Sequence, residues 1–336
     1  MIALSVRSGA LSELSIHYGS TARTTFISTL VVIVLIVVSV SGGYLLSSRA
    51  WASTLFFRGL AYANTQGDLD LAESNIIRAA GLGARDQYAR ALTNLNIVRM
   101  NRIVSQSGIP EQTLQAQFLQ QADNATRNAL IAYELRPHYY QNVAGLASVY
   151  EVLSVYKIGG AREEAEKRYQ EAVVASPENP LIPFLMARMY ASLGNTTKAQ
   201  QNLESALTKK QDFPEAILFY SQIEASRGNI KNAALIAERA LLYAPNDLGV
   251  LFQAGYLKYQ SKSYDEARII LERARTFAPN YSNARYFLGL TYGELGERDR
   301  AIREFTDIEQ LNPSNVDVKK ILANLRAGLP ALAGIR

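Results

Sequence analysis

The residues of this chain that could act as nucleophiles, bases or metal ligands form no recognisable catalytic or metal-binding motif. The chain has 336 residues, no cysteine and two histidines, His17 and His138, neither of which has a partner at metal-ligand spacing. The absence of cysteine excludes thiolate chemistry and disulfides. Glu163, Glu164 and Glu166 begin an expected helix, where carboxylates stabilise the positive end of the helix dipole. We therefore expect no enzyme activity, no metal site and no cofactor.

Phosphate and nucleic-acid chemistry are also poorly supported. Residues 81–86 read GLGARD, which superficially matches a glycine-rich phosphate loop. This stretch follows an expected helix and not a strand, so its glycines are expected to end that helix. The net charge is +5, but the basic residues form no run, and the sequence predicts no nucleic-acid partner.

Residues 26–46 form an uncharged apolar segment near the N-terminus. At 1.5 Å per residue, its 21 positions span roughly 31 Å, the thickness of a bilayer core. Arg23 and Arg49 flank the segment, and Tyr44 and Trp51 are suited to the membrane–water interface. The segment predicts a single transmembrane helix with the lipid bilayer as its environment.

A cleaved signal peptide is the alternative for this segment. Ala50 and Ala52 have the A-x-A spacing of a cleavage site before Ser53, but signal cores run about 7–15 residues and this one is longer. Basic residues lie on both sides of the segment, so they bias its orientation little. We expect the N-terminus in the cytoplasm and the remainder outside it.

The chain after residue 52 has a repeat with a period of 34 residues. Gly289 aligns with Gly255, and Pro313 aligns with Pro279. A small residue at the start of each second helix recurs with spacings of 34 residues that widen to 40 and 53 upstream, at Ala301, Ala267, Ala233, Ala199, Ala165, Ala125 and Ala72. Such a period indicates stacked helical hairpins.

The last repeat shows how one hairpin is encoded. Ala301, Phe305 and Ile308 stand at i, i+4 and i+7, which places them on one face of a helix. Gly296 is expected to end the preceding helix. Gly289 lies inside that preceding helix, at a cost of about 1 kcal/mol relative to alanine. We interpret it as a packing residue that lets the two helix backbones approach closely.

This pattern resembles the tetratricopeptide repeat (TPR) family, whose unit is a 34-residue helix–turn–helix. The small residue of the family's first helix matches Gly289 and Gly255, and its tyrosine matches Tyr292, Tyr190 and Tyr150. The family's tryptophan is absent from every repeat. The resemblance implies an all-α, right-handed superhelical TPR solenoid of about seven repeats with a C-terminal capping helix, after one transmembrane helix.

The domain boundaries follow from the period. They are an N-terminal tail 1–25, the span 26–46, a solenoid 53–315 with repeats 53–86, 87–139, 140–179, 180–213, 214–247, 248–281 and 282–315, a capping helix 316–327 and a tail 328–336. Repeat two has about nineteen extra residues, centred on SQSGIPEQTLQ and expected between its helices. Repeat three has six extra, ending at Gly159 and Gly160.

In the TPR family the first helices line a groove that binds peptides. The lysines and asparagines that clamp a C-terminal carboxylate in that family are missing at the matching positions, where an aromatic row stands instead. The candidate groove residues are Phe184, Arg188, Leu218, Gln222, Phe252, Tyr256, Tyr259 and Tyr286. The aromatic residues either pack between neighbouring repeats or form a groove for an apolar or extended peptide.

Two functions remain open at this point. The first is a membrane-anchored scaffold that binds a protein or peptide partner in a bacterial envelope assembly. The second follows from the start and end of the repeat region, which look like the C-terminal TPR region of bacterial O-antigen ligase/polymerase-like membrane proteins. That resemblance implies a non-catalytic module of a surface-polysaccharide system, with a polysaccharide-assembly membrane protein as partner. In both cases we expect a single-pass protein of the bacterial inner membrane, with the repeats outside the cytoplasm.

Overall fold

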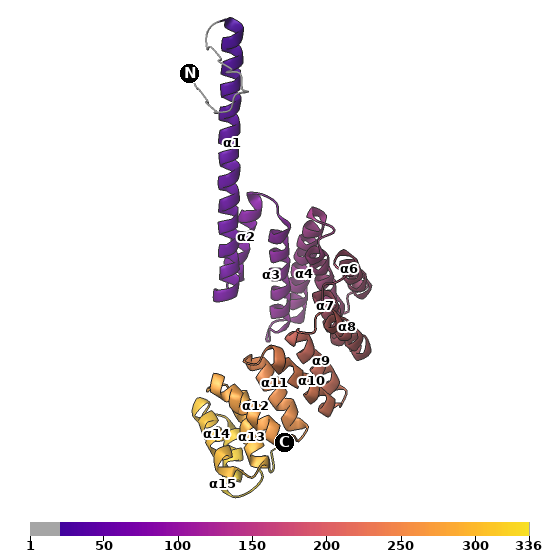
Figure 1. The fold of residues 1–336 in the computed structure, drawn as a ribbon, viewed down its shortest axis with the longest axis vertical. Coiled ribbons are helices and arrows are strands. Elements are labelled where there is room, and N and C mark those ends of the chain that lie inside the picture. Colours follow the sequence, from indigo (N-terminus) through magenta and orange to yellow (C-terminus); the bar gives the residue numbers. More distant parts are fainter. Residues whose placement is uncertain (1–20, 336) are drawn as a thin grey trace, which may run out of the picture. The chain divides into compact units, whose positions relative to one another are not determined.

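The fold is entirely helical, as expected. The computed structural model describes residues 21–335, and this part contains fifteen α-helices, one short π-helical turn and no strand (Figure 1). Two compact units divide the chain, Met1–Pro137 and His138–Arg336. His17 and positions 1–20 of the predicted tail lie outside the described residues.

Unit 1 contains a helix much longer than any other. Its elements are α1 (Ala22–Ala61), the π-turn η1 (Tyr62–Gln66), α2 (Leu69–Gly81), α3 (Asp86–Val104) and α4 (Glu111–Leu135). The 40-residue α1 includes both the apolar segment 26–46 and the first helix of the first hairpin. We had expected a boundary between the two, but residues 47–52 contain no glycine or proline and the helix continues through them.

By length and composition, one helix of the described region could cross a membrane, Ala22–Gln66, and a signal sequence near the N-terminus would meet the same criteria. Its apolar side chains are exposed throughout residues 30–38. Ala52, Leu55, Phe56 and Gly59 of the same helix are instead buried in unit 1. The N-terminal half of this continuous helix is therefore apolar and exposed, and its C-terminal half packs into unit 1.

The extra residues of repeat two do not form the loop that we expected between its helices. They lengthen both helices, so that α3 has 19 residues and α4 has 25, and the connection is reduced to positions 105–110. Only the first six residues of the quoted segment, SQSGIP, are non-helical, because Gly108 and Pro110 interrupt the helix, while EQTLQ begins the next one.

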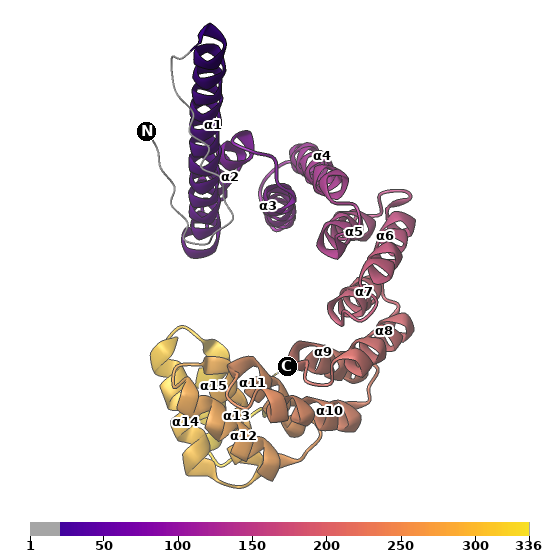
Figure 2. The same cartoon turned by 45° about the horizontal axis from the view of Figure 1, so that its top comes forward.

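Unit 2 is a series of helical pairs that follow one another in chain order (Figure 2). Its helices are α5 (Tyr140–Val155), α6 (Ala161–Ala175), α7 (Leu181–Ser192), α8 (Thr196–Lys209), α9 (Pro214–Ser226), α10 (Ile230–Tyr243), α11 (Leu248–Gln260), α12 (Tyr264–Phe277), α13 (Ser282–Glu294), α14 (Arg298–Leu311) and α15 (Val316–Arg326). First helices of neighbouring pairs also contact one another, α5 with α7, α9 with α11, and α11 with α13.

The turn inside each pair uses a left-handed residue at a fixed position. Gly194, Gly228 and Gly296 have φ values of +75°, +83° and +78°, which confirms that Gly296 ends its helix. Lys262 occupies the same position of its repeat with φ +64°. In all four turns the next residue donates its N–H to a carbonyl five residues earlier, as from Glu297 to Tyr292 at 2.8 Å.

The seven recurrent alanines are all fully buried. Their exposed fraction is 0% at every site, namely Ala72, Ala125, Ala165, Ala199, Ala233, Ala267 and Ala301. The small side chain leaves room for the neighbouring helix, which is why the period is visible in the sequence at all.

The position held by Tyr190 and Tyr292 carries opposite charges in the two repeats between them, Glu224 and Lys258. Both side chains are 5% exposed. Asn232 donates to the Glu224 carboxylate at 2.7 Å, and Lys258 pairs with Glu238 at 2.7 Å and also with Glu266. Each buried charge thus has a polar or charged partner within its own hairpin or the preceding one, which limits its desolvation cost.

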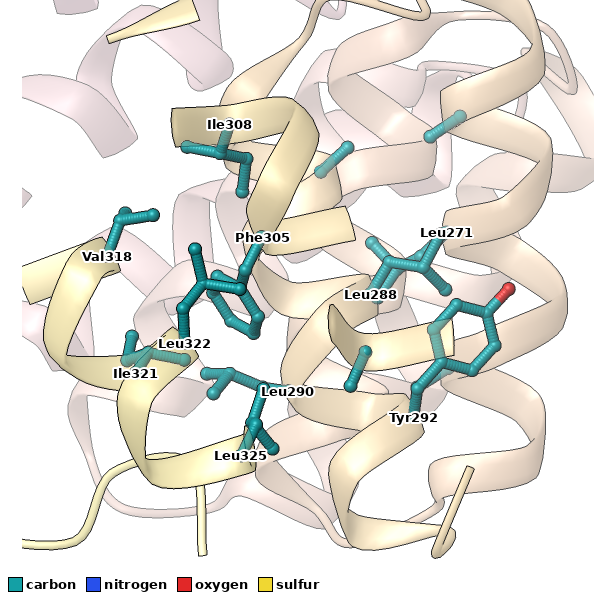
Figure 3. Packing of buried hydrophobic residues seen from close by; sticks show 14 of the residues in the cluster. Leu271, Leu288, Leu290, Tyr292, Phe305, Ile308, Val318, Ile321, Leu322 and Leu325 are labelled. Carbon is teal, nitrogen blue, oxygen red and sulfur yellow. The ribbon is translucent and has the colours of Figure 1, made fainter. Parts of the chain in front are cut away.

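Gly289 is buried where the ring of Phe305 crosses α13 (Figure 3). A Cβ placed on Gly289 would lie 2.7 Å from Cε2 of that ring, and at Gly255 it would lie 2.7 Å from Cδ2 of Leu271. The packing role is confirmed, with one correction: the space is filled by a side chain of the second helix, where we expected its backbone. Aromatic or branched residues can thereby lie flat against the first helix.

Helix α15 closes this end of unit 2. Val318, Ile321, Leu322 and Leu325 are buried and join the core that holds Phe305 (Figure 3). Asn315 begins the helix by accepting a hydrogen bond from the N–H of Val318 at 3.1 Å. The opposite face of α15 is polar or exposed, as a terminal cap requires.

We expect Gly289→Ala to destabilise the chain by about 1–3 kcal/mol, since the added methyl group overlaps the Phe305 ring. Gly289→Leu should do at least as much. Gly145→Ala is the matched control, because Gly145 lies inside α5 with nothing within 4 Å of its Cβ position, and it should stabilise by about 0.5–1 kcal/mol. Thermal unfolding followed by circular dichroism measures both; a Gly289→Ala protein as stable as Gly145→Ala would contradict the packing role.

Candidate aromatic face of unit 2

The candidate groove residues come from the first helices of four successive pairs, α7, α9, α11 and α13. Phe184, Leu218, Phe252, Tyr256, Tyr259 and Tyr286 are half-buried, whereas Arg188 and Gln222 are exposed. The amphipathic second helices cover the other side of each first helix, so these side chains are left partly accessible. The structure does not gather all eight of them at one place.

Four of these aromatic residues contact the ring of Phe287, which is not among the candidate groove residues. Phe287 has its ring centroid 6.0 Å from that of Phe252, 4.7 Å from that of Tyr256, 5.7 Å from that of Tyr259 and 5.4 Å from that of Tyr286. Tilted and edge-to-face pairs at these separations are attractive. Because α11 and α13 belong to adjacent repeats, the cluster also fastens one repeat to the next.

Further aromatic side chains extend this cluster at its margins. Tyr281 meets Phe252 edge-to-face at 5.4 Å, and Tyr264 lies 5.7 Å from Tyr259. We call Phe252, Tyr256, Tyr259, Tyr264, Tyr281, Tyr286 and Phe287 the aromatic face. The sequence contains a signal for Phe287. It follows Tyr286 directly, and the aromatic Phe219 stands two periods before it, with Gln253 at the equivalent position of the repeat between them.

Phe184 belongs to a separate and smaller group. Its ring lies 5.0 Å from Phe213 and 6.1 Å from Phe219, and none of these contacts reaches the aromatic face. Leu218 packs against the cores around α9 to α11. The residues of the expected aromatic row therefore belong to two clusters, because helix α9 carries Leu218 and Gln222 where the later repeat has aromatic rings.

Carboxylates lie close to the aromatic face. Burial raises the pKa of Tyr259 to about 12, and the charge of Glu294 adds to this effect. Burial also raises the pKa of Tyr286, with a contribution from Asp317. Both carboxylates are exposed. The tyrosine hydroxyls therefore remain protonated at physiological pH and can donate hydrogen bonds to a ligand.

A second polar group lies among α5, α6 and α7. The hydroxyl of Tyr169 is buried and donates to Oε2 of Glu151 at 2.6 Å, while Oγ of Ser148 lies 3.2 Å from the same hydroxyl. Burial raises the pKa of Glu151, while the Tyr169 hydrogen bond and the charge of Arg188 act in the opposite direction. Arg188 is thus a neighbour of this carboxyl and not of the aromatic face.

Residues considered for catalysis or metal binding are separated. His138 is exposed just before α5, and Glu163 and Glu164 lie in the first turn of α6. Among residues 21–335, no three histidine, aspartate or glutamate side chains form a group able to hold a metal ion. The GLGARD stretch is the turn after α2, which ends at Gly81 as expected.

Comparison with known proteins now adds to this geometry. Residues 282–315 match the family model described as the tetratricopeptide repeat, the same range as the last predicted repeat. Yeast Tom70 is similar in structure with a TM-score of 0.57 and 15% identity, over 84% of this chain and 55% of Tom70. The chain has the tetratricopeptide-repeat fold.

The pilF protein of Pseudomonas aeruginosa is also similar, with a TM-score of 0.50 and 16% identity over 71% of this chain and 98% of pilF. A search of curated protein sequences finds no match. Solenoid repeat proteins in general use extended concave surfaces to bind their partners. The likeness to O-antigen ligase/polymerase proteins is not tested by these comparisons and stays a prediction.

The raised pKa of Glu151 gives a pH dependence of stability. A carboxyl whose pKa is higher in the folded state binds a proton on folding, so stability falls as pH rises through the interval between its unfolded and folded pKa values. Above that interval the loss persists. Glu151→Gln should therefore be more stable than the parent at neutral pH and lose this difference in acid, while its amide oxygen still accepts from Tyr169.

Glu163→Gln, which removes an exposed carboxylate from α6, is the matched control. Denaturant unfolding of the three proteins at acid and neutral pH makes the comparison. A Glu151→Gln protein less stable than the parent at neutral pH would show that the charge of Arg188 and the Tyr169 hydrogen bond outweigh burial.

Proposed function

We propose that this chain is a membrane-anchored tetratricopeptide-repeat scaffold whose aromatic face binds an extended peptide segment of a protein partner. The observation that carries the proposal is the group of half-exposed rings around Phe287 on two neighbouring first helices. Fully structural rings would be buried as Phe305 and Tyr292 are. Partly exposed, preorganised aromatic residues are the usual anchors for a partner.

We infer that residues 26–46 are the anchor and that unit 2 supplies the binding domain, with the seven-repeat division given above. A bacterial inner-membrane location, with the repeats outside the cytoplasm in an envelope assembly, belongs to the same proposal. The continuity of α1 supports an anchor over a cleaved signal. A cut after Ala52 would divide the helix within the part that packs into unit 1.

The anchor predicts that the mature chain keeps its N-terminus and resists alkaline extraction from membranes. Intact-mass spectrometry should give the full-length mass, whereas signal cleavage would leave a chain that begins at Ser53. A double variant, Leu35→Arg with Val38→Arg, should lose membrane retention, since each charge at a helix centre costs about 2.5–3.5 kcal/mol. Extraction of the parent chain at alkaline pH would contradict the anchor.

The aromatic face predicts where a partner contacts the chain. A photo-crosslinking residue in place of Tyr256 should give a crosslinked protein in native membranes, and one in place of Leu242 should not. Leu242 is 76% exposed on α10, a second helix, and is therefore the more accessible control. The double variant Phe252→Ser with Tyr256→Ser should lose the partner in a pull-down. Equal crosslinking at both sites, or an unchanged partner, would exclude the face.

A further inference from the structure

Unit 1 has two ends that differ in charge. Helix α2 follows α1 after a short turn and returns along it (Figure 1), so that a Cβ on Gly59 would meet Ile76 and Ala72. The turn at residues 82–85 therefore lies at the end of unit 1 from which the apolar half of α1 emerges (Figure 1). The α3–α4 connection lies at the other end, where Arg102 donates to the carbonyl of Gly67.

The end beside the apolar segment is basic. Arg49 and Arg85 are exposed, and Arg136 at the end of α4 lies 3.8 Å from Asp86 at the start of α3. Asp86 is 12% exposed and also pairs with Arg90 at 2.5 Å. Glu134 is the exposed carboxylate at this end. The arginines outnumber the acids here, and the acid between them is largely buried.

The far end carries charges of both signs, since Arg58, Arg99 and Arg102 lie there beside the acidic residues at the start of α2. Asp70 has a side chain that is 94% exposed, and Arg99 holds both Asp70 and Glu73 at 2.6 Å. Asp68 begins α2 there by accepting hydrogen bonds from two backbone N–H groups. The charges at this far end largely balance one another, whereas arginines are in excess at the end toward the apolar segment.

The turn at residues 82–85 has an apolar, open tip. Gly81, Leu82, Gly83 and Ala84 are exposed and uncharged, and a Cβ on either glycine would meet nothing within 4 Å. Leu82 is 37% exposed, and Trp51, on α1 near this end, is 49% exposed. An apolar tip beside arginines and a tryptophan is the composition of a membrane interface.

The length of α1 determines how far this end of unit 1 lies from the end of the apolar segment. From Leu46, the last residue of the apolar segment, to Ala52, the first residue buried in unit 1, the helix rises about 9 Å. The headgroup layer is about 5–7 Å thick on each side of the bilayer core. If α1 spans a bilayer, the basic end of unit 1 is therefore within arginine reach of the lipid headgroups.

We propose that the 82–85 turn, with Arg49, Arg85 and Arg136, is a docking surface for the headgroups of an anionic membrane. This inference rests on the proposed role of α1 as an anchor. Unit 1 then stands upright on the bilayer with Leu82 in the interface, and the α3–α4 connection points away from the membrane.

The experiment uses the full chain in nanodiscs of phosphatidylcholine, alone or mixed with phosphatidylglycerol. Because the chain has no cysteine and one tryptophan, a fluorophore on Leu82→Cys and the native Trp51 report independently. A lipid with a nitroxide at headgroup level should quench both probes. The same fluorophore on Ser107→Cys, in the α3–α4 connection, is the matched control and should stay unquenched.

The charge is tested by Arg85→Gln with Arg136→Gln. Phosphatidylglycerol should increase quenching at residue 82, and this double variant should lose that increase, with headgroup affinity falling about fivefold for each arginine removed. Arg102→Gln removes the same charge from the far end and should change nothing. Circular dichroism establishes that each variant is folded.

The outcomes separate the two proposals. Quenching of Trp51 without quenching at residue 82 would leave the anchor intact and overturn the docking surface. Quenching at 82 that is equal in neutral and anionic nanodiscs would overturn the anionic preference. A chain in which neither Trp51 nor residue 82 is quenched would overturn the anchor and the docking surface together.

Discussion

The close contact between the two helices of each pair is the constraint on which the rest of this structure depends. Seven alanines that are wholly inaccessible to solvent lie in this contact, where a small side chain allows close approach. Large residues must then occupy the neighbouring positions, as Phe305 does across Gly289. A pair packed in this way still has an apolar stripe that only the next pair can cover. The stacking of pairs, the shared cores and the terminal helix α15 all follow from that need.

Features that recur because each repeat has the same local requirement could be predicted from the sequence. Alanines, turn glycines and closing prolines each answer to a condition set within a few residues, so the fold class, the last hairpin and the end of α2 could be predicted. Features set by contacts between repeats could not. Phe287 has its role because rings from α11 and α13 meet on it, and the split of the expected aromatic row depends on what α9 lacks. The lengthened α3 and α4 were missed because SQSGIP predicts a loop but not how short that loop is.

The departures from the repeat pattern show which positions can change without altering the geometry of the hairpin. Glu224 and Lys258 stand in a buried position that tyrosine holds on either side, yet each charge is satisfied nearby and the hairpins keep their geometry. Lys262 adopts the left-handed conformation that glycine adopts in three equivalent turns. These sites tolerate change because their neighbours compensate. The other repeats carry smaller aromatic groups or none at the equivalent positions, so the repeat pattern does not account for the aromatic face.

The unbroken course of α1 has a consequence for orientation. Successive residues of a helix are turned by about 100° around its axis, and nothing between the apolar half and the packed half interrupts that relation. The rotational setting of unit 1 about the helix axis is therefore fixed by the number of residues between Leu46 and Ala52. One residue more or fewer in this stretch would swing the α2–α4 side of the unit by more than a quarter turn while moving it along the axis by only about 1.5 Å. The number of residues in the stretch 47–51 therefore determines which way unit 1 faces around the helix axis, and it has much less effect on the distance of unit 1 from the apolar segment.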